Sequence, residues 1–308
     1  MKFKILLVAG LMLAVLAGAA VRAQETAAAV LTGTGLWLGS DPQDRADILI
    51  EGEALARLSW QADAPAFPGD RPGSLTALYD ARFAPGRLGV PLAEIWDQDD
   101  TFTAVAILVI EPDGFRADPN GFFAISWGLW NTAQTGMNRT GDFSDFAADS
   151  FELLEFAWFP NVSDFFGGPF LSPALFGEAD AASPLFPFLG GFANFAFGSE
   201  AADLPLGEPL MAVLEHRPEA DVIVVSVHRV VNGGRVVPIP GAVSVIDLTT
   251  LPRRAYSFDA LGLTLWQDGF SGEPSSLHAR VTYHRLAAVP GRVDRLESLL
   301  HLPPARRP

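Results

Sequence analysis

The chain contains no cysteine, and its only lysines are Lys2 and Lys4. Without cysteine there is no disulfide, thiolate nucleophile or cysteine zinc site. Without a later lysine there is neither a Schiff-base enzyme nor a Walker-type phosphate loop. After the N-terminus no segment has 18 uninterrupted apolar residues, so we expect no membrane span in the mature chain. The hydrophobic core alone must therefore hold the fold together.

The N-terminus has the pattern of an export signal. Lys2 and Lys4 precede an almost unbroken apolar run over residues 5–20, and Val21 and Ala23 are small residues at the positions that a signal peptidase reads. About 16 apolar residues are fewer than the ~20 that cross a bilayer. We therefore expect cleavage after Ala23, which removes residues 1–23 and exports the protein to the periplasm or the exterior.

The mature chain is strongly acidic. The full chain has 21 Lys and Arg, 36 Asp and Glu, and a formal net charge of −15. Residues 1–23 contain three basic residues and no acidic one, so cleavage changes the charge to 18 − 36 = −18. This charge disfavours nucleic acids and anionic membrane surfaces as partners.

Apolar runs rich in β-branched and aromatic residues recur between Gly, Pro, Asn and Asp clusters, while helical periodicity is scarce. The sequence thus predicts an all-β fold, a two-sheet antiparallel β-sandwich that forms one domain over residues 24–289. Asn232-Gly233 predicts a hairpin with a type I′ turn. A tail over residues 290–308 can form a short helix. The predicted strands are residues 47–51, 55–60, 74–80, 101–111, 121–131, 151–159, 209–215, 221–231, 234–239, 242–247, 261–267 and 276–287.

Residues 160–203 are rich in Phe, Gly and Pro and are predicted to form a long irregular excursion from the sheets. Two interpretations of its phenylalanines stay open. Either the phenylalanines line a binding surface, or they form a small separate hydrophobic cluster that holds a long loop in place.

Several segments carry a resemblance to a known group of proteins: GSLTALYD, ADPNGFFAISWGLWN, TGMNRTGDFSDF, FELLEFAWFPNVSDFFGGPFLSPALFG, FDALGLTLWQDG and LHARVTYHRL. Together they resemble uncharacterised exported bacterial proteins with a concanavalin A-like, laminin G-like jelly roll, over about half of the chain. The resemblance implies two curved antiparallel sheets, with ligands on the concave face or its rim loops. It implies no activity, because fold and function separate easily. Ala157 also replaces the polar residue expected after Glu155-Phe156, which leaves that face less equipped for chemistry.

Glu155 is the unusual residue of the strand FELLEFAWF, because alternation places it on one face with Leu153, Ala157 and Phe159. A carboxylate among apolar neighbours is expected to pair with an arginine or to act as a general acid. The glycoside hydrolases of this fold place their carboxylates at a period of two, whereas Glu152 and Glu155 are three apart and face opposite sides. The sequence therefore assigns no catalytic residue.

Trp127 and Trp130 lie on opposite faces of one strand, so one belongs to the core. The other either fills the sandwich as well or forms a platform on which a sugar ring stacks. The residues predicted to bind a glycan are Trp130, Asn131, Arg139, Glu155 and Asn161.

Two acidic loops are candidate calcium sites, since calcium takes six to eight oxygen ligands. One contains Asp142, Asp145 and Asp149, and the other contains residues 97–100; neither has EF-hand spacing, and solvated turns are the alternative. No other cofactor is expected. His278 and His284 are about 20 Å apart on one strand, too far to bind one metal. Ser226 and His228 lack the elbow motif of a nucleophile.

Three functions remain open. The first is a non-catalytic exported protein that binds a polysaccharide or cell-surface glycan on its concave sheet face. The second is a polysaccharide-cleaving enzyme that uses Glu155 and needs a second carboxylate nearby. The third is a structural or adhesive surface protein with no small ligand, for which a large exposed apolar patch would be the sign.

Overall fold

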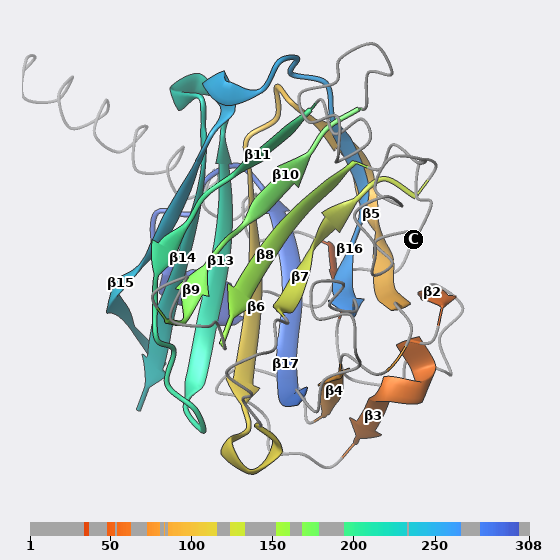
Figure 1. Ribbon diagram of the computed structural model, residues 1–308, viewed down its shortest axis with the longest axis vertical. Helices are drawn as coiled ribbons and strands as arrows, with labels where there is room; N and C mark the ends of the chain where they lie inside the picture. Colours follow the sequence, from red (N-terminus) through yellow and green to blue (C-terminus); the bar gives the residue numbers. More distant parts are fainter. Residues whose placement is uncertain are drawn as a thin grey trace, which may run out of the picture.

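The computed structural model describes residues 34–36, 48–52, 54–62, 73–80, 83, 86–115, 124–132, 152–160, 168–178, 194–232, 234–265 and 278–301. They form two antiparallel sheets packed face to face (Figure 1), which confirms the predicted β-sandwich. The export signal and the start of the domain lie outside these residues. Among the helices of the described ranges, none has the length and apolar character that crossing a membrane requires.

The eight-stranded sheet has the order β15-β14-β13-β6-β17-β4-β3, and β1 also pairs with β17. Its strands are β1 (Thr34–Leu36), β3 (Leu58–Gln61), β4 (Ser74–Asp80), β6 (Phe102–Ile110), β13 (Pro209–Arg217), β14 (Val222–Val231), β15 (Arg235–Asp247) and β17 (His278–Pro290).

The nine-stranded sheet has the order β11-β10-β8-β7-β16-β5-β2, with β9 paired to β8 and β12 paired to β9. Its strands are β2 (Leu49–Gly52), β5 (Gly86–Asp97), β7 (Ile125–Trp130), β8 (Leu153–Phe159), β9 (Phe170–Leu171), β10 (Ala174–Phe176), β11 (Phe195–Phe197), β12 (Glu200–Ala201) and β16 (Ser257–Leu265). Four short 3-10 helices of the described residues lie between strands, and a fifth, η8, follows β17: η2 (Ala54–Arg57), η3 (Pro112–Gly114), η6 (Pro218–Ala220), η7 (Leu248–Thr250) and η8 (Leu296–His301).

The main core lies between the sheets and follows the two-residue period of the strands. Trp127 of β7 points into it and stacks on Phe156 of β8, with ring centroids 5.7 Å apart. Trp130 belongs instead to a smaller apolar cluster on the outer face of the nine-stranded sheet. The prediction that the two tryptophans face opposite sides is therefore confirmed.

The C-terminal segment covers part of the outer face of the eight-stranded sheet. Leu299 and Leu300 of η8 pack with Ile107 and Met211 in a separate apolar cluster. The fully buried guanidinium of Arg285 donates a hydrogen bond to the carbonyl oxygen of Leu299. Burial lowers the pKa of Arg285 to about 10. The predicted helix of the tail is thus a 3-10 helix that packs on the sandwich.

Several predicted boundaries are wrong for identifiable reasons. Strand β5 was not predicted, because its Gly and Pro residues are typical of loops. Residues 234–239 and 242–247 belong to one strand, β15, in which a bulge separates the pairs Ser226 with Val243 and His228 with Pro238. The excursion over residues 160–203 is not wholly irregular, since it contains β9 to β12.

The hairpin at Asn232 is confirmed, but its turn type is not. Val231 pairs with Arg235, and the amide of Gly234 donates to the carbonyl of Val231 at 3.1 Å. Positive φ falls on Gly234, at 75°, whereas among the described non-glycine residues Asp221 alone has it. Asn232 therefore lacks the positive φ that a type I′ turn needs at both of its central residues, so the type I′ prediction is wrong at this residue.

Candidate functional site

The outer face of the nine-stranded sheet brings together the two central residues of the sequence prediction. Glu155 of β8 pairs with Gly128 of β7, and Trp130 lies two residues further along β7 on the same face. The side chain of Glu155 is 0% exposed and that of Trp130 is 1% exposed. A ligand can therefore touch either group only when the outer side of this face is uncovered.

Glu155 lies in a group of four buried polar side chains, which we call the polar group: Glu155, Thr264, Ser126 and Arg87. The Thr264 hydroxyl lies 2.5 Å from the Glu155 carboxylate and 3.0 Å from the Ser126 hydroxyl. Ser126 in turn donates to the carbonyl of Thr264 at 2.7 Å. Arg87 is directly opposite Thr264 on β5. Burying charged and hydroxyl groups costs free energy, so their concentration on one sheet face marks it as a candidate site.

The indole of Trp130 lies over glycine. Gly128, Gly262 and Gly89 are directly opposite one another on β7, β16 and β5. A Cβ atom at Gly89 or Gly262 would lie 2.5 Å from the outer edge of the Trp130 ring, which shows that the ring occupies the space their side chains would need. The Arg87 guanidinium lies 5.7 Å from the ring centroid, within reach of a cation–π contact. Glycine and arginine together fix where Trp130 lies.

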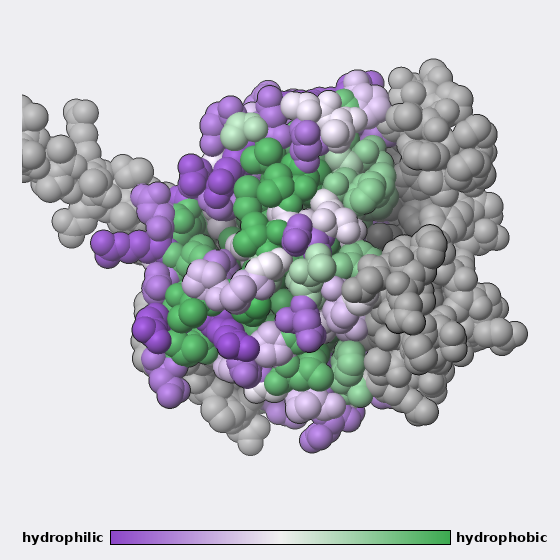
Figure 2. All heavy atoms as spheres, turned by 60° about the vertical axis from the view of Figure 1, so that its left-hand side comes forward, coloured by the Kyte–Doolittle hydropathy of each residue, from purple (hydrophilic) through white to green (hydrophobic). Residues whose placement is uncertain are grey.

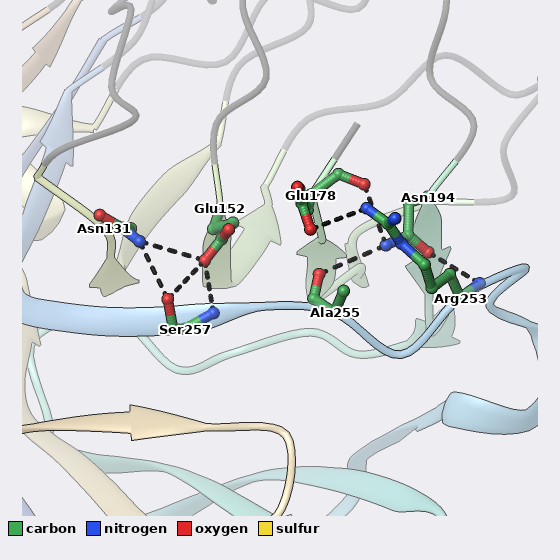
Figure 3. A network of polar contacts seen from close by, with 7 residues as sticks. All are labelled: Asn131, Glu152, Glu178, Asn194, Arg253, Ala255 and Ser257. Atoms are coloured by element: carbon green, nitrogen blue, oxygen red, sulfur yellow. Dashed lines mark hydrogen bonds and ion pairs between the residues drawn. The ribbon is translucent and has the colours of Figure 1, made fainter. Parts of the chain in front are cut away.

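Asn131 forms hydrogen bonds that hold the ends of neighbouring strands together. Its side-chain nitrogen donates to Glu152 at 3.2 Å and to the hydroxyl of Ser257 at 3.0 Å (Figure 3). The Ser257 hydroxyl and amide also donate to the Glu152 carboxylate. These bonds join the ends of β7, β8 and β16, so the amide of Asn131 is engaged by protein groups where the sequence predicted a ligand.

A second polar network lies beside the first in Figure 3. Asn194 donates to the carbonyls of Glu178 and Ala255, at 3.2 and 3.4 Å, and accepts from the amide of Arg253 at 3.4 Å. Arg253 also forms an ion pair of 2.7 Å with Glu178. These bonds join β10 and β11 to the segment that leads into β16. They hold strand ends together.

The remaining predicted site residues, Arg139, Asn161, Asp142, Asp145 and Asp149, lie outside the described residues. The acidic loop that follows β5 is described, and it is a turn closed by its own side chains. Asp97 accepts from the amide of Asp99 at 2.8 Å, and Asp100 accepts from the amide of Asp97 at 2.9 Å. Within the described ranges no three His, Asp or Glu residues are grouped as a metal site requires.

The histidines within the described strands have structural contacts. His216 is fully buried, with Nδ1 2.5 Å from the carbonyl oxygen of Asp100 and Nε2 2.8 Å from the Tyr256 hydroxyl. Burial lowers the pKa of His216, against an opposing effect of the Asp100 carbonyl. Ser226 and His228 do contact each other, at 2.9 Å. They project from β14, which pairs with β13 and β15, and they do not lie on the sharp strand-to-helix turn of a nucleophile elbow.

Arg87, Ser126 and Thr264 were missed from the sequence, because they come from three separate strands and become neighbours only through strand register. The alternation of side chains along each strand could have identified them, because it places one polar residue among apolar residues on the sheet face that carries Glu155. Fold and site together define a two-sheet antiparallel β-sandwich with a candidate binding site on one sheet face.

No protein-family model matches the chain, and no curated protein matches it either. Among solved structures it is similar to a marine PL-14 alginate lyase from Aplysia kurodai, with a TM-score of 0.50, 9% identity, and coverage of 85% of this chain and 99% of the lyase. Lectin II from Ulex europaeus matches with a TM-score of 0.41, 10% identity, and coverage of 81% and 94%. The Emp47p carbohydrate recognition domain matches with a TM-score of 0.44, 12% identity, and coverage of 85% of this chain and 98% of that domain. At such identities the alginate lyase comparison shows the fold alone.

Proposed function

We propose that the protein binds a polysaccharide or cell-surface glycan on the outer face of its nine-stranded sheet, without catalysing a reaction. The observation that carries this proposal is the polar group, which holds a carboxylate and a guanidinium on the face turned away from the main core. Carboxylates, hydroxyls and guanidinium groups bind sugar hydroxyls. The neighbouring ring of Trp130 is 1% exposed in this structure, and it offers a flat surface to the C–H face of a sugar once this side of the sheet is uncovered.

This site keeps Trp130 and Glu155 from the sequence prediction and adds Arg87, Ser126 and Thr264. Asn131 acts as a framework residue. Calcium and the exported location stay proposals that rest on the sequence.

Polysaccharide cleavage is the second candidate, and one observation favours it. Glu155 is a fully buried carboxylate with a hydroxyl 2.5 Å away, and glutamate is among the side chains that general acid–base catalysis uses. The alginate lyase from Aplysia kurodai has the same fold, so this scaffold is compatible with an enzyme that acts on a polysaccharide.

The test is a glycan and polysaccharide array probed with residues 24–308, with and without calcium. Three proteins are compared: the unchanged chain, Glu155→Gln, and Glu208→Gln. Glu208 is an exposed carboxylate directly before β13, so its variant removes the same charge away from the site. We expect the unchanged chain and Glu208→Gln to bind the same polymer and Glu155→Gln to bind it at least about tenfold more weakly.

A reducing-end release assay on that polymer separates the two functions. Binding without release supports the non-catalytic protein, whereas release that Glu155→Gln abolishes with binding retained supports the enzyme. No binding to any polymer, in either calcium condition, contradicts the proposal.

A further inference from the structure

An aromatic series leads from the protein surface toward the candidate site. Phe197 of β11 is 57% exposed, and its ring stacks on Phe195 with centroids 5.4 Å apart and planes 20° apart. Phe195 in turn contacts Phe176 of β10, with centroids 4.7 Å apart. Single exposed apolar residues are ordinary, but here the exposed ring is the last of three in contact.

Strand register connects this series to the site. Phe195 is directly opposite Phe176, Phe176 is opposite Leu153, and Leu153 is opposite Trp130. In the neighbouring row, Phe197 is opposite Ala174, which is opposite Glu155. Residues directly opposite one another share a sheet face, so Phe197 lies on the same face as Glu155 and Trp130.

The spacing indicates how large a ligand could touch both ends. Phe197 and Glu155 are two strand spacings apart, or about 10 Å. That distance is longer than a single hexose ring. The face therefore combines an exposed aromatic residue at its edge with buried polar groups further in, along a line that runs across the strands.

We propose that Phe197, supported by Phe195, forms an outer subsite for a linear polysaccharide that lies across the strands toward Glu155. The proposal rests on the proposed function. The flat face of Phe197 stacks on one sugar ring of the chain, while a ring further along binds the polar group once that buried group is uncovered. The ligand class is thus an extended polymer and not a monosaccharide.

The alternative occupant of this surface is a second copy of the chain. Figure 2 shows hydrophobic residues gathered among hydrophilic ones on the side where β15 comes forward. Val243 and Val245 of β15 are each 47% exposed, and β11 contacts β15. The continuity of Phe197 with Phe195, Phe176 and the Trp130 row favours the polysaccharide, and the experiment includes the second copy as an outcome.

The experiment measures affinity for a length series of oligosaccharides from the polymer that the array identifies. Phe197→Ala is compared with Phe197→Trp and with Ile95→Ala, which truncates another exposed apolar side chain, on β5, that is 68% exposed. We expect Phe197→Ala to weaken the longest oligosaccharides roughly three- to tenfold and to leave the shortest unchanged. Phe197→Trp should retain the affinity, and Ile95→Ala should match the unchanged chain at every length.

The outcomes separate this inference from the proposed function. If the unchanged chain binds oligosaccharides and Phe197→Ala binds every length equally well, the subsite is refuted while the proposed function stands. If the unchanged chain binds nothing, both fail. If Phe197→Ala converts a dimer into a monomer in sedimentation and leaves affinity unchanged, a second copy occupies the surface and the inference is overturned.

Discussion

The Tyr79 hydroxyl connects the two sheets directly beneath the candidate site, and the Tyr283 hydroxyl of its own sheet bonds to it; the number of protons these hydroxyls carry leads to a specific prediction. Tyr79 of β4 donates its single proton to the carbonyl oxygen of Ser126 at 2.7 Å. The Tyr283 hydroxyl is 2.6 Å from the Tyr79 oxygen, and since the Tyr79 proton is engaged, Tyr283 must be the donor. Burial raises the pKa of both tyrosines, so both hydroxyls keep their protons at neutral pH.

Tyr79→Phe removes two hydrogen bonds and leaves the Tyr283 hydroxyl buried without its acceptor. We expect a loss of about 2–4 kcal/mol in the free energy of unfolding, because an unsatisfied buried group adds about 1–3 kcal/mol to a lost bond. Tyr283→Phe removes one bond and leaves Tyr79 bound to Ser126, so it should cost about 1 kcal/mol. The double variant leaves no unsatisfied hydroxyl, and should therefore be more stable than Tyr79→Phe alone.

The measurement is equilibrium urea unfolding of the three variants and the unchanged chain, with the slope of free energy against urea used to check that compactness is unchanged. A double variant as unstable as the sum of the two single variants would show that the proton assignment is wrong. Equal losses of unfolding free energy in Tyr79→Phe and Tyr283→Phe would refute the assignment of two hydrogen bonds to the Tyr79 hydroxyl.

Three further predictions follow from buried residues. Since burial lowers the pKa of His216, the unfolded chain binds the proton more readily, and the protein loses stability as the pH falls below about 6.5. The free energy of unfolding in urea should therefore differ less between about pH 5.5 and about pH 7.5 in His216→Gln than in the unchanged chain. Leu299→Ala should destabilise the protein by about 2–5 kcal/mol in the same assay, since that side chain is fully buried in the apolar cluster with Ile107 and Met211; a smaller loss would contradict a packed η8. Gly89→Ala should be less destabilising in a Trp130→Leu background, and strictly additive unfolding free energies would refute the contact between the two residues.

The polar group shows how far the sequence could predict the site. Glu155 stood out because one carboxylate interrupts an apolar alternation within a single strand. Thr264 and Arg87 are 109 and 68 positions away from Glu155 in the chain, and no local pattern connects them to it. Asn131 shows the converse: its position beside Trp130 predicted a ligand contact, while its actual partner Ser257 lies on another strand.

Alternation and turn chemistry were enough to establish an all-β sandwich and the opposite orientations of Trp127 and Trp130, because the period of a strand is a property of the local backbone. The tertiary structure decided the register that sets Glu155 beside Gly128, lays the Trp130 ring over Gly89, and aligns Phe197 with the Glu155 row. Register is fixed by packing between segments far apart in the chain, so only the folded structure contains it.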